Sequence, residues 1–189
     1  MSKKEKDFAV PFLEGKIIKL CPLNIEHATL YTKWSNDPDV RRYSRNIFPW
    51  SIDEIKKWSE PEEESIQKEV AFEIWHHKDE KPIGTAGLGN INWINRNANL
   101  FIAIGEPEYW DQDIGLEVGR LLIDYGFKEL NFHKIYAGIY TPNKRSLRTA
   151  EKIGLKFEAT LKEQVYVDGQ FFDEVKLAIF KKDWLISKQ

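Results

Sequence analysis

The sequence predicts a single α/β (α+β) domain with a mixed, mostly antiparallel sheet of about seven strands and helices on both faces. Its 189 residues, 42% of them hydrophobic, suffice for one buried core and are too few for two. Three β-rich runs between residues 69 and 106 are separated by short polar turns, as in an antiparallel meander. A helical pattern then separates the strand at 100–104 from the strand at 133–140. This connection is long enough to join two parallel neighbours.

The first third of the chain is predicted to form a strand followed by helices. The strand occupies residues 16–21, and Asn24 can cap the helix that follows. Ser51 and Glu54 have the spacing of a capping box, which opens a second helix. That helix runs into the acidic segment 60–65, which could attract a polyamine or a basic N-terminus or could form a solvated face.

The second half is predicted to contain a crossover helix, a strand, a short helix and a hairpin. From Gly115 onward, apolar residues recur at the spacing of one buried helical stripe. Asn143 and Gly154 have the positions of an N-cap and a C-terminal glycine around the short helix. Asp168 and Gly169 form a strong hairpin signal. The final hairpin strand could pair across a homodimer.

Composition excludes several classes of protein. The 28 basic and 30 acidic residues leave a net charge of −2, so no overall field would recruit nucleic acid or an anionic membrane. The single cysteine, Cys21, cannot form an internal disulfide, and no His, Asp or Glu spacing suggests a metal site. No signal peptide or membrane-spanning run is visible, and we expect a cytoplasmic protein with a tail at 1–12 and a domain at 13–186.

Five segments resemble one enzyme superfamily. They read LEGKIIKLCPL, WSNDPDVRRYS, IGEPEYWDQDIGLEVGRLLIDYGFKELNFHKIY, NKRSLRTAEKIGL and VYVDGQFFDEVKLAIF. In this order and spacing, over residues 13–184, the chain resembles the GCN5-related N-acetyltransferase (GNAT) superfamily. The branch is that of ribosomal-protein N-terminal acetyltransferases and spermidine N-acetyltransferases.

The resemblance implies transfer of an acetyl group from acetyl-CoA to a primary amine, either a protein N-terminus or a small amine such as a polyamine. The amine would attack the thioester directly, without a covalent enzyme intermediate. The cofactor would lie in a V-shaped opening between the fourth and fifth predicted strands. The alternative is a non-catalytic binding protein that keeps the fold. In that case the departures from the superfamily pattern at Asn99, Asp111, Asp113 and Ala150 reflect a loss of cofactor binding and catalysis.

The start of the crossover helix is the expected pyrophosphate site. Backbone N–H groups without intrahelical partners, together with the helix dipole, suit an anion there. The residues concerned are Asp111, Gln112, Asp113, Ile114, Gly115 and Leu116. The superfamily pattern has glycines at three alternate positions of this stretch, and only Gly115 remains. In the competing interpretation, Asp113 caps a structural helix and no phosphate binds.

Two further segments are expected to contact the cofactor. Asn143 and Ser146 match the superfamily positions near the pantetheine, although they also fit an N-cap and a first-turn serine. The backbone amides of Ile102, Ala103 and Ile104 match the stretch that pairs with pantetheine and polarises the thioester carbonyl. Lys144 and Arg145 could pair with phosphates or could be solvated.

Direct transfer also needs an acid and a base. Many relatives carry a tyrosine as the acid at the position of Ala150, which leaves Ser146, Tyr140 or water as substitutes.

Relatives often have a glutamate that grips or deprotonates the amine at the position of Asn99. The nearest alternatives by predicted location are Glu73, His76 and Glu106, each of which could equally be an ordinary strand-end or surface residue.

Overall fold

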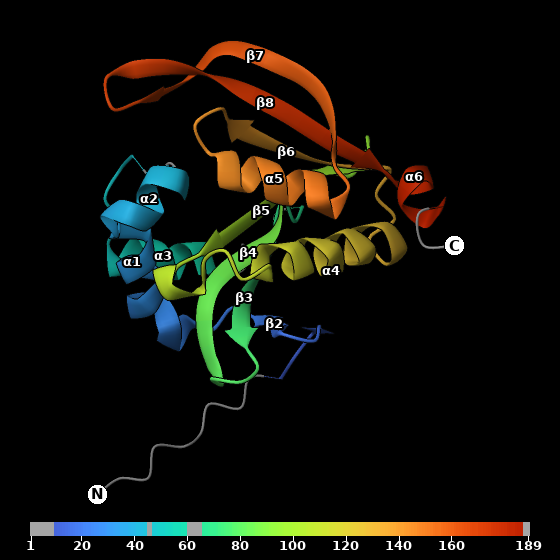
Figure 1. Ribbon diagram of the computed structural model, residues 1–189. Helices are drawn as coiled ribbons and strands as arrows, with labels where there is room; N and C mark the ends of the chain where they lie inside the picture. The colour runs from blue at the N-terminus through green and yellow to red at the C-terminus, as the bar shows by residue number, and fades with distance from the viewer. Residues whose placement is uncertain (1–9, 45–46, 60–65, 187–189) are drawn as a thin grey trace, which may run out of the picture.

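The described residues form one mixed sheet, to which eight strands are assigned (Figure 1). The structure is a computed structural model and describes residues 10–44, 47–59 and 66–186. In the order β1-β2-β3-β4-β5-β6-β8-β7, all neighbours are antiparallel except β5 and β6, which are parallel. The predicted fold class and parallel pair are confirmed. The strand beyond the expected seven is the two-residue β1, which pairs with β2.

Helices and strands follow one another along the chain as the meander and crossover predict. The strands are β1 (Leu13–Glu14), β2 (Ile18–Pro22), β3 (Val70–His76), β4 (Lys81–Asn92), β5 (Asn97–Ile104), β6 (Lys134–Tyr140), β7 (Lys156–Val167) and β8 (Gln170–Phe180). The helices are α1 (Ala28–Asn36), α2 (Pro38–Ser44), α3 (Ile52–Ser59), α4 (Ile114–Lys128), α5 (Lys144–Ile153) and α6 (Lys181–Ile186), with 3₁₀ turns η1 (Ile25–His27) and η2 (Pro107–Tyr109). None of the helices in the described ranges combines the length and apolar character needed to cross a membrane.

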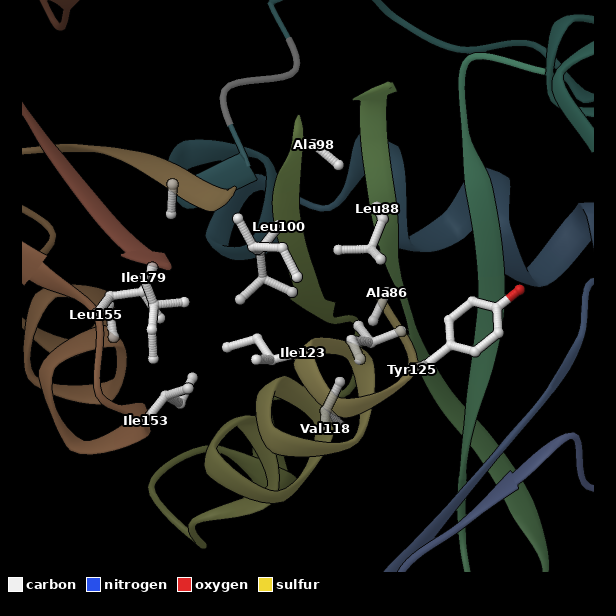
Figure 2. Packing of buried hydrophobic residues seen from close by; sticks show 14 of the residues in the cluster. Ala86, Leu88, Ala98, Leu100, Val118, Ile123, Tyr125, Ile153, Leu155 and Ile179 are labelled. Atoms are coloured by element: carbon white, nitrogen blue, oxygen red, sulfur yellow. The ribbon is translucent and has the colours of Figure 1, made fainter. Parts of the chain in front are cut away.

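Helices cover both faces of the sheet. On one face, α4 and α5 lie side by side (Figure 1). Figure 2 shows Val118 and Ile123 of α4 between that helix and the strands that carry Leu88 and Leu100. Both α4 side chains are fully buried, and burial of a side chain of this size contributes about 1.5–3 kcal/mol. Over the other face, α1 and α3 pack against each other around Tyr31.

A helix that the sequence interpretation missed follows α1 directly. We expected the segment around Asp37 to end one helix, and it does, but it also begins α2. The carboxylate of Asp37 accepts the N–H groups of Asp39 and Val40, at 2.9 and 3.1 Å, and Pro38 is the first helical residue. An aspartate N-cap followed by proline is a recognised helix start, so the signal was present.

The other predicted caps form. The N–H of Ser51 donates to Glu54 Oε2 at 2.8 Å, and the N–H of Glu54 donates to Ser51 Oγ at 3.3 Å, which is the capping box. Asn24 accepts the N–H of Glu26, although the helical turn it caps is η1. The acidic segment 60–65 and residues 1–9 of the expected tail lie outside the described residues.

A carboxylate ties the sheet edge to α4. Glu117 accepts the backbone N–H groups of Lys16, Ile17 and Ile18 at 2.5, 2.8 and 3.2 Å. A Cβ added to Gly15 would lie 2.7 Å from the Glu117 carboxyl carbon, so this close approach requires glycine. The turn before β2 is thereby fixed to the first turn of the crossover helix.

The C-terminal hairpin has the predicted turn. Asp168 and Gly169 both have positive φ, 50° and 81°, as a two-residue hairpin turn requires. However, β8 lies between β6 and β7 and is paired with β6 over residues 174–180, so the strand of this hairpin at the edge of the sheet is β7. Pairing of the hairpin across a homodimer stays a prediction.

Cys21 provides a test of the fold. Burial raises the pKa of the Cys21 thiol to about 11, with Lys19 opposing the shift and Glu73 adding to it. The thiolate is the reactive form, so we expect iodoacetamide at pH 8 to label native protein at least about tenfold more slowly than protein in denaturant. Mass spectrometry of timed samples measures the difference, and equal rates in the two states would contradict a buried Cys21.

Candidate functional site

A cleft opens where the two parallel strands part. β5 and β6 pair only at Asn97–Lys134, Ala98–Ile135 and Asn99–Tyr136. Beyond these pairs, both strands continue without pairing to each other, and a cavity of about 730 Å³ lies there. The crossover helix α4 connects the strands, as predicted. The V-shaped opening expected from the resemblance is thus present in the backbone.

The cavity brings most of the predicted site residues together. They come from β5, the α4 start, the end of β6 and the first turn of α5: Ile102, Ala103, Ile104, Asp111, Gln112, Asp113, Ile114, Gly115, Leu116, Tyr140, Asn143 and Ser146. Asn99 and Ala150, the two positions at which the chain departs from the superfamily, also line it. Glu73, His76 and Glu106 do not.

The amides of β5 divide between the sheet and the cleft. Gly105 N–H donates to the Ile83 carbonyl of β4 at 2.8 Å, and N–H direction alternates along an antiparallel strand. Ala103 N–H therefore faces β4, whereas the N–H groups of Ile102 and Ile104 face the opening. The Ile104 carbonyl also points away from β4, because it accepts the Trp110 indole N–H at 3.0 Å. Ala103 thus lines the cleft without offering its amide to it, contrary to expectation.

The loop before α4 has the left-handed backbone conformations that usually require glycine, although aspartates occupy these positions. Asp111 and Asp113 have φ of 60° and 55°, in the left-handed region that aspartate tolerates better than most residues. Gly115 has no positive φ, and an added Cβ there would meet only Thr149 Cγ2, at an ordinary 3.4 Å. The unusual conformations therefore occur at the two aspartates and not at the glycine that the sequence singled out.

Asp113 does not cap the helix with its carboxylate. Its side chain makes no cap hydrogen bond and instead pairs with Lys152 of α5 at 3.2 Å. Its backbone carbonyl accepts the N–H of Leu116, so that amide is committed, contrary to expectation. Within the described chain, the amides from Gln112 to Gly115 have no protein acceptor. The helix start therefore retains donors for an anion.

The first turn of α5 faces the same cavity. Buried Asn143 caps the helix, and its Oδ1 accepts the Ser146 N–H at 3.1 Å. The Arg145 guanidinium stacks 4.0 Å from the Trp110 ring, and Tyr43 lies 5.2 Å away. Stacking holds this cation in the cleft wall. From the sequence, Arg145 could be either a phosphate ligand or a solvated side chain. The stacking on Trp110 could not be predicted, because the two residues are far apart in the chain.

Charge in the cleft suits an anionic cofactor. Three basic side chains of α5, namely Arg145, Arg148 and Lys152, line it together with the two aspartates. Lys152 already offsets one aspartate. The unpaired amides and these cations therefore fit the pyrophosphate and phosphate groups of a coenzyme A.

Aromatic side chains line the part of the cleft near the N-terminal helices. They are Tyr31 and Trp34 of α1, Trp50, and Trp58 of α3. Asn36 fixes the Trp50 backbone with two hydrogen bonds, at 2.7 and 2.9 Å. Aromatic faces of this kind attract ammonium groups.

Glu73 lies beneath this aromatic wall rather than in the cleft. Its buried carboxylate accepts hydrogen bonds from the Tyr31 hydroxyl and from Trp75 Nε1 at 2.6 Å, and His27 Nδ1 lies 2.6 Å away. Burial and the hydrogen bond to Glu73 raise the pKa of Tyr31. Glu73 is therefore placed to hold α1 on the sheet.

The other acid–base candidates are also engaged. Partial burial opposes ionisation of Glu106, but hydrogen bonds from Trp34 and Lys33 outweigh it and lower its pKa. His76 Nδ1 lies 2.8 Å from Asp79 Oδ2, outside the cleft. The Tyr140 hydroxyl donates to the Arg42 carbonyl at 3.1 Å.

The site combines three features: parallel strands that diverge, a helix start with unpaired amides, and a wall with basic side chains. Together they suit a coenzyme that binds between the two strands. A family model described as Acetyltransferase (GNAT) domain matches residues 18–156. The chain is 26% identical over 168 residues to the spermidine N(1)-acetyltransferase of Escherichia coli K12, covering 89% of this chain and 88% of that protein. It is 30% identical over 180 residues to the probable N-acetyltransferase YjcK of Bacillus subtilis 168, covering 90% and 98%.

A solved structure agrees with the fold. It is the spermidine N-acetyltransferase of Vibrio cholerae in complex with CoA and spermine, with a TM-score of 0.80 and 23% identity, covering 90% of this chain and 99% of that one. The chain belongs to the GNAT acetyltransferase family. It is an N-acetyltransferase that uses acetyl-CoA as the acetyl donor, and the non-catalytic alternative is not supported.

Removing the charge at position 113 is expected to tighten acetyl-CoA binding. Asp113→Asn keeps a residue suited to left-handed φ and removes a carboxylate beside the expected phosphate site, a change worth about 1 kcal/mol, or roughly fivefold in Kd. Isothermal titration with acetyl-CoA at low salt measures it. Asp113→Gly should tighten binding equally and additionally raise stability, by about 1 kcal/mol. A Kd unchanged in both variants would show that the carboxylate does not face the cofactor.

Proposed function

We propose that this protein acetylates a small cationic primary amine by direct attack of the neutral amine on the thioester of acetyl-CoA. The aromatic wall of Tyr31, Trp34, Trp50 and Trp58 in the same cavity as the β5 amides carries this proposal. Such a wall suits an alkylammonium, through cation–π attraction to the charge and apolar contact with the chain. The similarity to proteins named spermidine N-acetyltransferases supports a small amine over a protein N-terminus.

Direct attack is supported by the position of the one cysteine. Cys21 is buried in β2 and does not line the cleft, so no thiol is placed to receive the acetyl group. When bound, acetyl-CoA supplies the activated acetyl group. We propose that the Ile102 and Ile104 amides, which face the opening, bond the cofactor and stabilise negative charge on the carbonyl oxygen during attack.

We propose Ser146, one of the hydroxyl-bearing residues that line the cleft, as the group that passes a proton. It lies half-buried in the cleft, and its side chain makes no hydrogen bond to another described residue. Ala150 offers only a methyl group. We therefore assign removal of the ammonium proton before attack to solvent, and return of a proton to the coenzyme A thiolate to Ser146 or to solvent.

Two measurements test the proposed function. Isothermal titration should detect acetyl-CoA binding, and a thiol-release assay should then show turnover with spermidine or butylamine above that with a dipeptide or a ribosomal-protein N-terminal peptide. Turnover confined to peptides would replace the small amine with a protein N-terminus. Binding without turnover on any of the amines would remove the proposed acceptor class.

We also propose that β7 joins two copies of the chain. It is an edge strand of 12 residues, and Phe157 and Leu161 on it are exposed. An exposed edge strand with apolar side chains favours pairing with another chain. Light scattering coupled to size-exclusion chromatography should give a dimer that Leu161→Lys weakens, and a monomer at all concentrations would contradict this assignment.

A further inference from the structure

Glu69 lies in line with Asn99 across three strands. Val70 pairs with Leu88 and Gly89 pairs with Asn99, so Glu69, just before β3, stands opposite Gly89. Directly opposed residues of an antiparallel pair point to the same face. Asn99 lines the cleft, and the superfamily resemblance implies an amine-binding glutamate at this position in many relatives. Glu69 is thus a carboxylate two strands away, in the same row and on the same face.

Gly89 leaves the space that this carboxylate uses. A Cβ built on Gly89 would lie 3.2 Å from Glu69 Oε2, and the Phe101 ring would lie 3.8 Å from the same point. Neighbouring strands are about 4.8 Å apart, so a glutamate that extends over a glycine reaches toward the next strand. The carboxylate therefore lies over the middle strand of the three, on the side of Phe101 and Asn99. Those two residues line the cleft, whereas Glu69 itself is not among the lining residues and lies next to them.

The surroundings of Glu69 suit a bound cation. Its Oε1 accepts the Trp58 indole N–H at 3.0 Å, and Trp58 itself lines the aromatic part of the cleft. Burial raises the pKa of Glu69, and the hydrogen bond from Trp58 partly offsets the shift. No described basic side chain forms an ion pair with Glu69. A partly buried carboxylate without a described cation partner, bonded to one indole and near a second aromatic ring, suits an ammonium group.

We infer that Glu69 binds the ammonium group of the acceptor, with Trp58 and Phe101 as its aromatic walls, in place of the glutamate that relatives often carry at the position of Asn99. This inference deepens the proposed function and rests on it for the identity of the acceptor as a small cationic amine. The occupant is an aliphatic amine that binds in its protonated form, and the nitrogen that attacks loses its proton to solvent before the reaction. A neutral molecule of the same shape should bind poorly, because it leaves the carboxylate unpaired.

The test measures binding of spermidine and of butylamine by titration calorimetry, with coenzyme A at saturation. We expect Glu69→Gln to weaken amine binding about tenfold or more and to leave the acetyl-CoA Kd and the urea midpoint unchanged. Glu26→Gln, an exposed glutamate on η1, is the control and should change nothing. Glu69→Gln combined with Asn99→Glu moves the carboxylate back to the superfamily position and should restore amine binding.

Each outcome decides the inference separately from the proposed function. If the wild type binds and acetylates amines but Glu69→Gln binds them equally, the inference fails and the proposed function stands. If amines bind in a Glu69-dependent manner without turnover, Glu69 is an ammonium-binding residue, but the amines are not acceptors and the proposed function fails. If the wild type binds neither amine, both are overturned. Weakened binding that Asn99→Glu does not restore, together with a lowered urea midpoint, would assign Glu69 a purely structural role.

Discussion

Ile102→Pro is expected to lower kcat by about 10²- to 10³-fold, the usual effect of removing one oxyanion donor. Proline lacks the N–H that Ile102 directs into the opening between β5 and β6. That N–H does not bond to β4, because the hydrogen-bonded pairs of the β4–β5 ladder fall at odd-numbered β5 residues such as Ala103. The substitution should therefore remove the proposed oxyanion donor while the ladder remains intact. Steady-state assays at saturating acetyl-CoA and amine measure the loss.

Two controls separate the amide from the side chain and from the fold. Ile102→Val keeps the N–H and trims one methylene, so its kcat should stay within about threefold of wild type. Ala103→Pro removes an N–H that faces β4 and should instead lower the unfolding midpoint. If Ile102→Pro unfolds the protein, an ester linkage in place of the Ile102 amide removes the same donor with less strain. A kcat at the wild-type level in the ester variant would exclude Ile102 as the donor.

Glu73→Leu is expected to lower the free energy of unfolding by about 3–5 kcal/mol, the usual result of removing one partner of a buried charged network. The leucine leaves the Tyr31 hydroxyl and the Trp75 indole N–H without their acceptor, and it removes the partner of His27. Each buried donor left unpaired costs about 1–3 kcal/mol. Urea unfolding with linear extrapolation measures the change.

The matched control for Glu73 is an exposed glutamate nearby. Glu26→Leu on η1 should change the unfolding free energy by less than about 0.5 kcal/mol. Tyr31→Phe removes one donor to Glu73 and the acceptor of the Asn24 N–H, and it should cost less than Glu73→Leu. A Glu73→Leu variant as stable as the wild type would mean that apolar packing compensates fully for the lost hydrogen bonds, and that the carboxylate is not needed to hold α1 on the sheet.

Features of the fold that depend on neighbouring residues could be predicted from the sequence. The capping box at Ser51, the Asp168-Gly169 turn and the crossover helix each rest on a few adjacent side chains, and each forms as expected. The start of α2 at Asp37 has an equally local signal, but the same residues also end α1. The sequence interpretation took the segment around Asp37 only as the end of α1 and therefore missed the start of α2.

The candidate site could be located from the sequence but not described in detail. Asp111 and Asp113 were interpreted through their charge, whereas their left-handed backbone decides how the loop turns. The stacking of Arg145 on Trp110 and the row that links Glu69 to Asn99 join residues far apart in the chain. Such contacts depend on strand register, which no local pattern specifies.

The short seam between β5 and β6 has a consequence for stability. Three residue pairs join β5 to β6, and beyond Asn99 and Tyr136 the two strands are not paired with each other. A cofactor that bonds to the Ile102 and Ile104 amides would add hydrogen bonds along β5 where β6 does not, and would thereby contribute to the stability of the folded state. Ligand at a hundredfold excess over its Kd adds about 2.7 kcal/mol to the unfolding free energy. The melting temperature should therefore rise with acetyl-CoA concentration. Hydrogen exchange should slow first along β5 and β6. The melting temperature can then be used to measure how much of the protein has cofactor bound.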